Sequence, residues 1–456
     1  MRALEQRSQP EIRKSRWLVL VPLLLGVLGG GLATSMINTA LPRIATDLSV
    51  SAGSQAWIVD VYPLALAVSL VPAVRLGDRY GRRRMLLSGL AVVALLNIVA
   101  SLFPNGIALI ACRAALGVAG AMVLASVVST VGQTFRGHDL AVADGAWVTV
   151  VGVGGAVGPA AGGILTQAEG WRWVFRCLSL LAVLAGVAAW RLMPESPTQR
   201  LRARWDGVGV ALSVVTVGGM VYGIQHLVPD PFAGGLFLAA GAAAAAWLVR
   251  RQRRTADPLI DISLLRRTGF AKSTTQILVS AATAAACLYL VSLHLQHTLG
   301  RTPLEAGVAL APQAAGTAFG GVLAPLSLRW TAAATAVRAA LVVQAAGLLV
   351  LSWNGTAVFA PIALVGFGYG AVGTLATTAL FEAATPSRSS QAGAIQEIAF
   401  AFGSGAGIAF FSAVAGIGPR HGFFLAIATA GLLTGAAAGI PVIASKLSGL
   451  TSGLPA

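Results

Sequence analysis

The stretch from residue 75 to residue 84 reads RLGDRYGRRR and carries one acid among five arginines between two long apolar segments. Such a run cannot lie in hydrocarbon, where one charge at the centre costs at least about 2.5 kcal/mol on insertion scales. It must form a short aqueous turn between two membrane-spanning helices, because the flanking segments are long enough to span. Its positive charge places this turn on the cytoplasmic side.

The composition excludes a soluble domain. Hydrophobic residues make up 56% of the chain and charged residues 11%, whereas soluble domains average about a quarter charged residues. The formal net charge is +16, but the basic residues lie in short bursts between apolar runs. A nucleic-acid-binding protein would gather them on one folded face, so we expect no nucleic-acid partner. Cys112, Cys177 and Cys287 show no motif spacing, so neither a disulfide framework nor a zinc site is predicted.

Fourteen segments are long and apolar enough to cross a membrane as helices, at about 20 residues each. They begin near Trp17, Gln55, Met85, Gly106, Ala141, Trp171, Gly207, Phe232, Ala271, Leu304, Ala333, Val358, Gln391 and Phe423. An even number of spans places both termini on the same side of the membrane. The apolar run after the basic N-terminus is of spanning length, so no cleavable signal peptide is predicted.

The basic residues alternate between loops. They lie before the first helix (Arg7, Arg13, Lys14, Arg16), between helices 2 and 3 (Arg79, Arg82, Arg83, Arg84), between 4 and 5 (Arg136), between 6 and 7 (Arg200, Arg202, Arg204) and between 8 and 9 (the RRQRR run at 250–254, Arg266, Arg267). Cytoplasmic loops are enriched in Lys and Arg. We therefore expect a multi-pass protein of the cell (plasma) membrane with both termini in the cytoplasm.

Two long polar segments divide the chain. They cover 193–206 and 250–267 and bracket a pair of helices, which leaves six helices on each side. We predict an all-α membrane protein with an N-terminal six-helix bundle (1–192), a linker with a two-helix insertion (193–267) and a C-terminal six-helix bundle (268–456). Transporters built from such halves bind substrate near the midplane between them.

The turn at 75–84 resembles the loop between helices 2 and 3 of the major facilitator superfamily. The residues at the characteristic positions are Asp78, Arg79, Gly81 and Arg82, while Val74 stands where the family usually has its first Gly. The resemblance implies that these residues form a gate, and that Asp78 latches it by contacting the opposite half of the protein.

Further motifs fit the same family in the same order. ALIACRAALGVAGA carries Arg113 and Gly117 in the fourth helix, with Leu116 in place of the usual Gln. GVGGAVGPAAGG (152–163) resembles the signature of proton-driven antiporters, and WRWVF (171–175) opens the sixth helix as in the fourteen-helix drug antiporters. WIVDVY (57–62) and AIQEIAF (394–400) resemble segments of quaternary-ammonium and multidrug exporters.

The antiporter signature has mechanical consequences of its own. Its glycines, which include Gly154, Gly158 and Gly162, make the fifth helix slim and allow tight packing. Pro159 removes a backbone hydrogen bond and bends the helix. We expect this tight packing to block proton leak.

Asp60 and Arg113 lie at similar depths in the second and fourth helices, about five and seven residues from the outer ends. An acid and a base embedded at one level are expected to pair, because an unpaired charge there is costly. One interpretation is a fixed ion pair that joins the two helices. The other is that protonation of Asp60 releases Arg113 and shifts the equilibrium between the bundles.

Glu397 is the other embedded acid, about six residues into the thirteenth helix. Burial disfavours the charged form of a carboxyl unless a cation binds, so Glu397 is predicted to exchange a proton for a cationic substrate. The alternative is that the helix begins later and leaves Glu397 at the wet surface. Asp144 and Glu382 lie nearer to cytoplasmic helix ends and are interpreted as interfacial residues.

The candidate residues fall into two groups. Those predicted to couple protons are Asp60, Arg113 and Glu397, and those predicted to bind substrate are Asp60, Tyr62, Asn38, Glu397 and Gln313. Ala33 stands where the related exporters carry an acid, nine residues before the Pro of an ALP segment. With fewer membrane carboxylates, monovalent cations are expected to be preferred over dications.

The sequence thus predicts proton-coupled efflux of amphipathic, cationic drugs or toxic organic compounds by alternating access. No phosphate-binding GxxxxGK[ST] loop occurs, and neither a cofactor, a metal nor an enzymatic activity is expected. The expected partners are a small-molecule substrate, protons and the lipid bilayer, with the protein as a monomer. One alternative is a dedicated exporter of a single natural product, and another is a membrane receptor or scaffold that transports nothing.

Overall fold

The structure is a computed structural model. It describes residues 16–103, 105–194, 206–227, 230–255, 262–301, 303–353, 358–384, 389–415 and 422–451. Within these ranges the regular elements are all helical, and fourteen helices are long and apolar enough to cross a membrane. The number of spans predicted from the sequence is therefore confirmed.

The spanning helices are α2 (Leu20–Asp47), α3 (Ala52–Tyr80), α4 (Arg82–Leu102), α5 (Gly106–Thr134), α6 (Gly137–Ala168), α7 (Arg172–Leu192), α8 (Gly207–His226), α9 (Pro231–Gln252), α10 (Thr268–Leu293), α11 (Pro303–Ser327), α12 (Ala333–Trp353), α13 (Phe359–Ala383), α14 (Ser389–Ala415) and α15 (Gly422–Thr451). Two short turns accompany them, the 3₁₀ turn η1 (Ile262–Arg266) and the π-helical turn η2 (His294–Thr298). The largest difference from the predicted starts is at α6, which begins at Gly137 rather than near Ala141.

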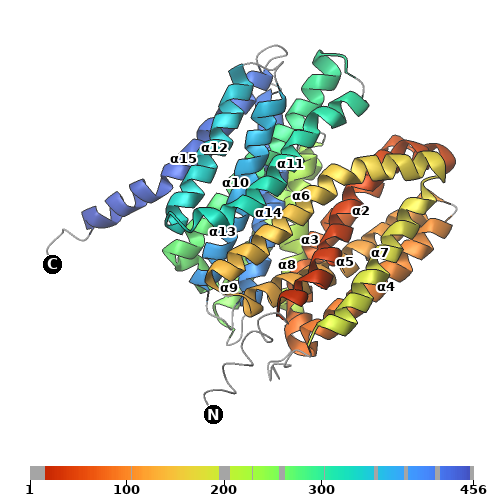
Figure 1. Ribbon diagram of the computed structural model, residues 1–456, viewed down its shortest axis with the longest axis horizontal. Helices are drawn as coiled ribbons and strands as arrows, with labels where there is room; N and C mark the ends of the chain where they lie inside the picture. Colours follow the sequence, from red (N-terminus) through yellow and green to blue (C-terminus); the bar gives the residue numbers. More distant parts are fainter. Residues whose placement is uncertain are drawn as a thin grey trace.

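Helices α2–α7 form one six-helix bundle and α10–α15 form the other (Figure 1). The same packing order holds in both. The first helix of each bundle packs on the fifth, the second on the fourth and the third on the sixth, which pairs α2 with α6, α3 with α5 and α4 with α7, and likewise α10 with α14, α11 with α13 and α12 with α15. This repeat is the architecture from which transporters with a binding site between two halves are built.

The two bundles meet along α6, which packs against α11 and α13, and along α14, which packs against α3 and α5. Glycines allow the two bundles to pack closely here. A methyl group added at Gly145 would stand 2.4 Å from Gly321 O. Another, at Gly132, would stand 2.6 Å from the Phe381 ring. These contacts lie toward the ends of the helices at which α2 begins and the turns at Arg79–Arg84 and Arg136 stand. We call this the arginine-rich side.

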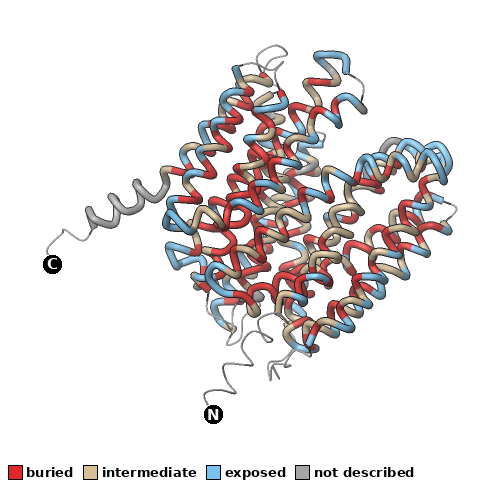
Figure 2. The backbone as a smooth tube through the Cα atoms, viewed as in Figure 1, coloured by how far each residue is buried: buried red, intermediate tan, exposed pale blue. Residues whose placement is uncertain are grey.

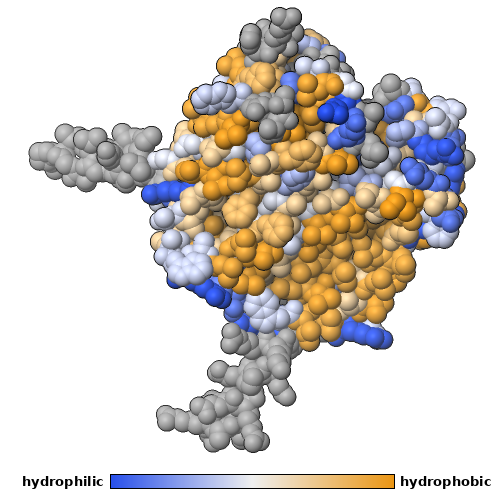
Figure 3. Space-filling view, turned by 45° about the horizontal axis from the view of Figure 1, so that its top comes forward, coloured by the Kyte–Doolittle hydropathy of each residue, from blue (hydrophilic) through white to orange (hydrophobic). Residues whose placement is uncertain are grey.

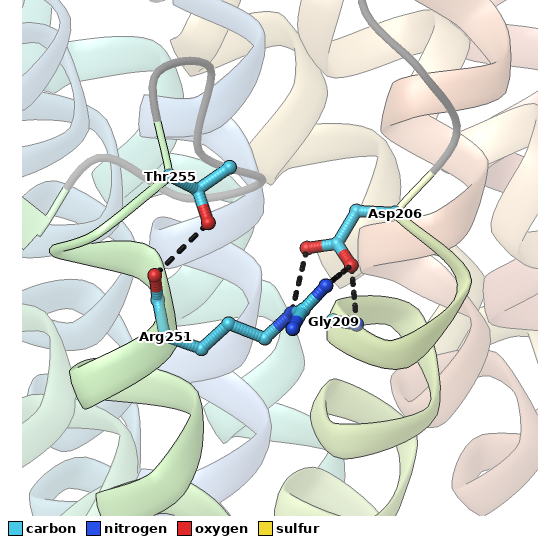
Figure 4. A network of polar contacts seen from close by, with 4 residues as sticks. All are labelled: Asp206, Gly209, Arg251 and Thr255. Carbon is cyan, nitrogen blue, oxygen red and sulfur yellow. Dashed lines mark hydrogen bonds and ion pairs between the residues drawn. The ribbon is translucent and has the colours of Figure 1, made fainter.

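Helices α8 and α9 pair with each other, and α8 also lies against α3 and α14. Asp206 caps the start of α8, where its Oδ1 accepts from Gly209 N at 2.9 Å. The same oxygen accepts from Arg251 Nη2, near the end of α9, at 2.8 Å (Figure 4). This ion pair ties the two ends of the insertion together on the arginine-rich side.

Large apolar side chains cover the outside of the molecule as well as its core. Exposed examples occur on most helices and include Leu102, Ile107, Trp190, Phe232, Phe319 and Trp353. Figure 2 shows the buried residues along the inner faces of the helices, and Figure 3 shows a broad hydrophobic surface with hydrophilic patches near its margins. A surface of this kind is stable in lipid and would aggregate in water.

Candidate functional site

A cavity of about 410 Å³ lies among the helices and is walled by α2–α7 together with α11, α13 and α14. This volume falls within the range of about 300–1,000 Å³ that is usual for small-molecule sites. Its lining is mostly apolar, with Leu25, Leu66, Val93, Val151 and Ala182 among the lining residues. The charged residues that line it are Arg113, Asp144 and Glu397.

Arg113 is held by α3. Its side chain is 1% exposed, its Nε donates to Ile58 O at 3.0 Å and its Nη2 reaches Val59 O at 3.5 Å. The guanidinium carbon lies 4.6 Å from the centroid of the Tyr62 ring, a cation–π contact. Two backbone carbonyls and an aromatic face therefore stabilise this buried charge.

The predicted pairing of Arg113 with Asp60 is wrong. Among the described residues, no ion pair or hydrogen bond joins these two side chains. Asp60 and Tyr62 are two residues apart on a helix of 3.6 residues per turn, so their side chains point about 200° apart. Since Tyr62 faces Arg113, Asp60 faces away. It is exposed, does not line the cavity, and has His226 of α8 as an ionisable neighbour.

Glu397 lies where the sequence predicted an embedded acid. It is half-buried and lines the cavity, and its Oε1 accepts from Gln396 Nε2 at 3.4 Å. Tyr369 and Phe400 line the cavity beside it, with their rings edge to face at 6.1 Å. Because α14 already begins at Ser389, the alternative in which the helix begins later and leaves Glu397 at the wet surface is wrong.

Asp144 was interpreted as interfacial, and the structure corrects this. The residue is 1% exposed, lines the cavity, and its Oδ2 lies 3.0 Å from Thr378 Oγ1 of the other bundle. The helical spacing of Asp144 from Trp147, Val148 and Val151, which all line the cavity, was the signal that could have placed it there. The interpretation failed because α6 begins four residues earlier than predicted, which puts Asp144 deeper in the span.

The remaining substrate candidates separate into two groups. Tyr62 lines the cavity, as does Ala33. Asn38 is exposed on α2 and is not part of the lining. Gln313 donates to Ala284 O at 3.1 Å, so it joins α11 to α10 inside its own bundle rather than facing the cavity, and Thr317, one turn further along α11, lines the cavity instead.

The gate candidates form a compact turn between α3 and α4. Gly81 has a φ of +92°, a conformation that favours glycine. Asp78 accepts from Arg82 Nη2 at 3.3 Å, and Arg82 also donates to Gln133 of α5. Arg79 is exposed, with its guanidinium over the ring of its neighbour Tyr80.

The antiporter helix α6 uses glycines on two faces. Gly154, Gly158 and Gly162 face α2, and a methyl group at Gly162 would stand 2.8 Å from Met36 Cα. Ser35 reinforces this contact by donating to Gly154 O at 3.0 Å. Gly145 and Gly152 instead face α11, while Pro159 is exposed.

A family model described as Major Facilitator Superfamily matches residues 23–408. The chain belongs to the major facilitator superfamily. The resemblance stated from its motifs is confirmed, and the protein is a multi-pass membrane transporter rather than an enzyme.

Two curated relatives are bacterial proteins. The chain is 32% identical over 403 residues to the multidrug efflux pump LfrA of Mycolicibacterium smegmatis, an alignment covering 86% of this chain and 79% of LfrA. It is 32% identical over 305 residues to the tetracenomycin C resistance and export protein of Streptomyces glaucescens, covering 66% of this chain and 56% of that protein.

A solved structure has the same fold. The crystal structure of the human organic anion transporter MFSD10 matches with a TM-score of 0.68, covering 93% of this chain and 99% of that one. The two are 15% identical, so this likeness concerns the fold alone.

Proposed function

We propose that the protein exports amphipathic, cationic organic compounds across the plasma membrane in exchange for protons, by alternating access of its two bundles. The observation that carries the proposal is Glu397, a half-buried carboxyl in the wall of a mostly apolar cavity between the bundles. The efflux and export functions named for LfrA and for the tetracenomycin C protein support the direction of transport.

The cavity offers a different surface to each part of such a substrate. Its apolar walls accept an apolar body, since burying apolar surface is favourable by roughly 25 cal/mol per Å². The carboxylate of Glu397 attracts a positive group. Once it is protonated the carboxyl is neutral, so it binds a cation more weakly. Competition at one carboxyl therefore couples proton uptake to substrate release.

Arg113 and Asp60 have separate parts in this proposal. Arg113 is fixed by the backbone of α3, so it holds a positive charge in the cavity wall that repels a cation from that wall. Asp60 takes up protons beside His226, on the face of α3 that lies against α8.

The driving force depends on how many protons enter for each substrate that leaves. Exchange of one proton for one monovalent cation moves no net charge, so only the pH difference drives it, at about 1.4 kcal/mol per pH unit. Each further proton that enters down 100 mV adds about 2.3 kcal/mol, and a hundredfold substrate gradient requires roughly 2.7 kcal/mol. In the proposed orientation the arginine-rich side faces the cytoplasm and both termini lie there. The protein acts as a monomer in this proposal.

The test is ethidium transport into inverted vesicles that contain the purified protein and an imposed proton gradient. Wild type should accumulate the dye, and a protonophore should abolish accumulation. Glu397→Gln should lose at least about tenfold in rate for a cationic dye, which equals roughly 1.4 kcal/mol, and lose much less for a neutral amphiphile. Transport that persists without any proton gradient would contradict proton coupling, and equal losses for both dyes would contradict the role of Glu397.

A dedicated exporter of one natural product is the second candidate. The relative that is named for export of tetracenomycin C favours it. Growth-inhibition tests with a panel of drugs and aromatic natural products, in a host lacking its own efflux pumps, separate the two. Protection against several unrelated cations supports multidrug export, whereas protection against a single compound supports the dedicated exporter.

A further inference from the structure

Asp144 occupies the contact between the two bundles, and the proposed proton coupling does not yet use it. The side chain leaves α6 about two turns from the arginine-rich end, and its partner Thr378 is five residues from the corresponding end of α13. At the neighbouring Gly145 the backbones of α6 and α11 are so close that an added methyl group would stand 2.4 Å from Gly321 O. Asp144 therefore lies where the bundles must separate if this side opens.

The hydrogen atoms of this contact can be counted. Thr378 Oγ1 lies 3.0 Å from Asp144 Oδ2 and 2.9 Å from Thr374 O. A hydroxyl has one hydrogen to donate. If Asp144 is ionised, Thr378 can satisfy only one of these two acceptors. If Asp144 is protonated on Oδ2, it donates to Thr378, which donates to Thr374 O, and both contacts become hydrogen bonds.

The other carboxyl oxygen gives an independent indication. Asp144 Oδ1 is buried and has no hydrogen-bond partner among the described residues. A buried carboxylate needs donors or a cation to offset the loss of hydration. Here the contact supplies one shared hydroxyl, so the closed contact accommodates the neutral acid and not the carboxylate.

The surrounding ionisable groups do not change this result. Those that share the cavity are Glu397 from α14, Tyr369 from α13, Arg113 from α5 and Tyr62 from α3. At the start of α6, Asp139 is paired with Arg16. Helices α2 and α11 carry their ionisable residues, Arg43, Asp47 and Glu305, at the opposite ends, and the arginines of α7 lie near its two ends. Among the described residues, Thr378 is the side chain that forms a hydrogen bond with Asp144.

We propose that Asp144 is a second proton site, which must be protonated for the bundles to close on the arginine-rich side and which releases its proton to water when they separate there. The proton enters from the cavity onto Oδ2 and leaves from the same oxygen, so no other bond changes. The inference rests on the proposed proton-coupled cycle and adds to it the step that links protonation to closure.

The experiment measures closure without substrate. Spin labels are attached at His138→Cys, on α6, and at Arg329→Cys, after α11, in a background without the three native cysteines; both positions are exposed. The distance between the labels is recorded in lipid nanodiscs as the pH is varied. In wild type the short distance should dominate at low pH and give way to a longer one as the pH rises.

Two variants and one control decide the outcome. Asp144→Asn imitates the neutral acid and should keep the short distance at every pH. Thr378→Val removes the hydroxyl oxygen that accepts the hydrogen bond from protonated Asp144. Loss of this one hydrogen bond should move the transition to lower pH by about half to one unit. Glu382→Gln, an exposed acid one turn further along α13, should behave as wild type.

Two results would overturn the inference. One is that the label distance in Asp144→Asn still changes with pH as in wild type, and that the change occurs at the wild-type pH in Thr378→Val. The other is that the label distance in wild type does not respond to pH. Because no substrate is present, failure of ethidium transport leaves this measurement intact. Conversely, proton-coupled transport together with an unchanged transition in both variants removes the role of Asp144 and keeps the proposed function.

Discussion

At the scale of single residues, Arg113 and Glu397 line one cavity from opposite bundles, and each is held by its own bundle. The sequence predicted that both are embedded, because a charged residue within an apolar span is costly unless it is paired or faces a cavity. It did not predict the partner of Arg113. Depth along two helices is readable from residue counts, whereas the direction of Asp60 depends on how α3 is rotated, which only packing against α5 and α8 determines.

Ala33 provides a prediction at the same scale. It lines the cavity on α2, where related exporters carry an acid, so the cavity lacks one carboxylate that would offset a second positive charge. Wild type should export a monovalent dye at least about tenfold faster than a matched divalent dye, the equivalent of roughly 1.4 kcal/mol. Ala33→Asp should reduce that ratio, because the new carboxylate lowers the cost of holding a dication.

Asn38→Asp is the matched control for this prediction. It adds the same charge to the same helix, but at an exposed position outside the cavity lining. The dye ratio should therefore stay as in wild type. Efficient export of the divalent dye by wild type, or an equal effect of both substitutions, would refute a role for the missing acid.

At the scale of helices, length and hydropathy were sufficient to predict fourteen spans, because lipid requires each backbone polar group to be satisfied within a helix. The glycines of α6 were recognised as packing positions, but their partners could not be predicted. Gly154 faces α2 in its own bundle and Gly145 faces α11 in the other. Small residues indicate that another backbone comes close and not which one.

The insertion of α8 and α9 allows a test of how its ends are joined. The hydrogen bond from Arg251 holds the pKa of Asp206 below its ordinary value. Asp206→Asn keeps the N-cap but removes the charge, so it should destabilise the first turn of α8 only slightly. Asp206→Ala also removes the cap, worth about 0.5–2 kcal/mol. Hydrogen exchange of the first-turn amides of α8 should therefore rise slightly in the first variant and strongly in the second.

The dependence on pH has a definite sign. The pKa of Asp206 is lower in the folded protein than in the unfolded chain. The ion pair therefore contributes fully to stability above the ordinary pKa of Asp206, and this contribution is lost as the pH falls through the lower pKa of the folded protein. The difference between wild type and Asp206→Asn should vanish under strongly acidic conditions. Asp230→Asn, at the cap of α9 on the opposite side, should leave exchange in α8 unchanged, and an effect there equal to that of Asp206→Asn would contradict a local ion pair.

At the scale of the whole molecule, the repeated packing order of the two bundles explains why the motion can be described as one body against another. Each bundle is held by its own close helix pairs, and the bundles touch through a few helices, chiefly α6 and α14. The division into two bundles and an insertion was predictable from two polar segments. The contact surface between the bundles was not, since it brings together residues as far apart as Asp144 and Thr378.

The last prediction concerns the turn between α3 and α4. Asp78 and Arg82 pair on the arginine-rich side, about two helical turns beyond Leu70, the cavity residue of α3 that is nearest to them in sequence. Asp78→Asn should loosen the turn between α3 and α4, because the amide cannot form the charge-assisted hydrogen bond with Arg82. It should leave the cavity as it is. Turnover in vesicles should fall several-fold, by about 1 kcal/mol in the barrier, while the dissociation constant for a fluorescent substrate stays within about twofold of wild type. Arg79→Gln, which changes an exposed charge of the same turn, should lower turnover less. A large loss of affinity with unchanged turnover in Asp78→Asn would show that this turn communicates with the binding cavity and does not act as a gate.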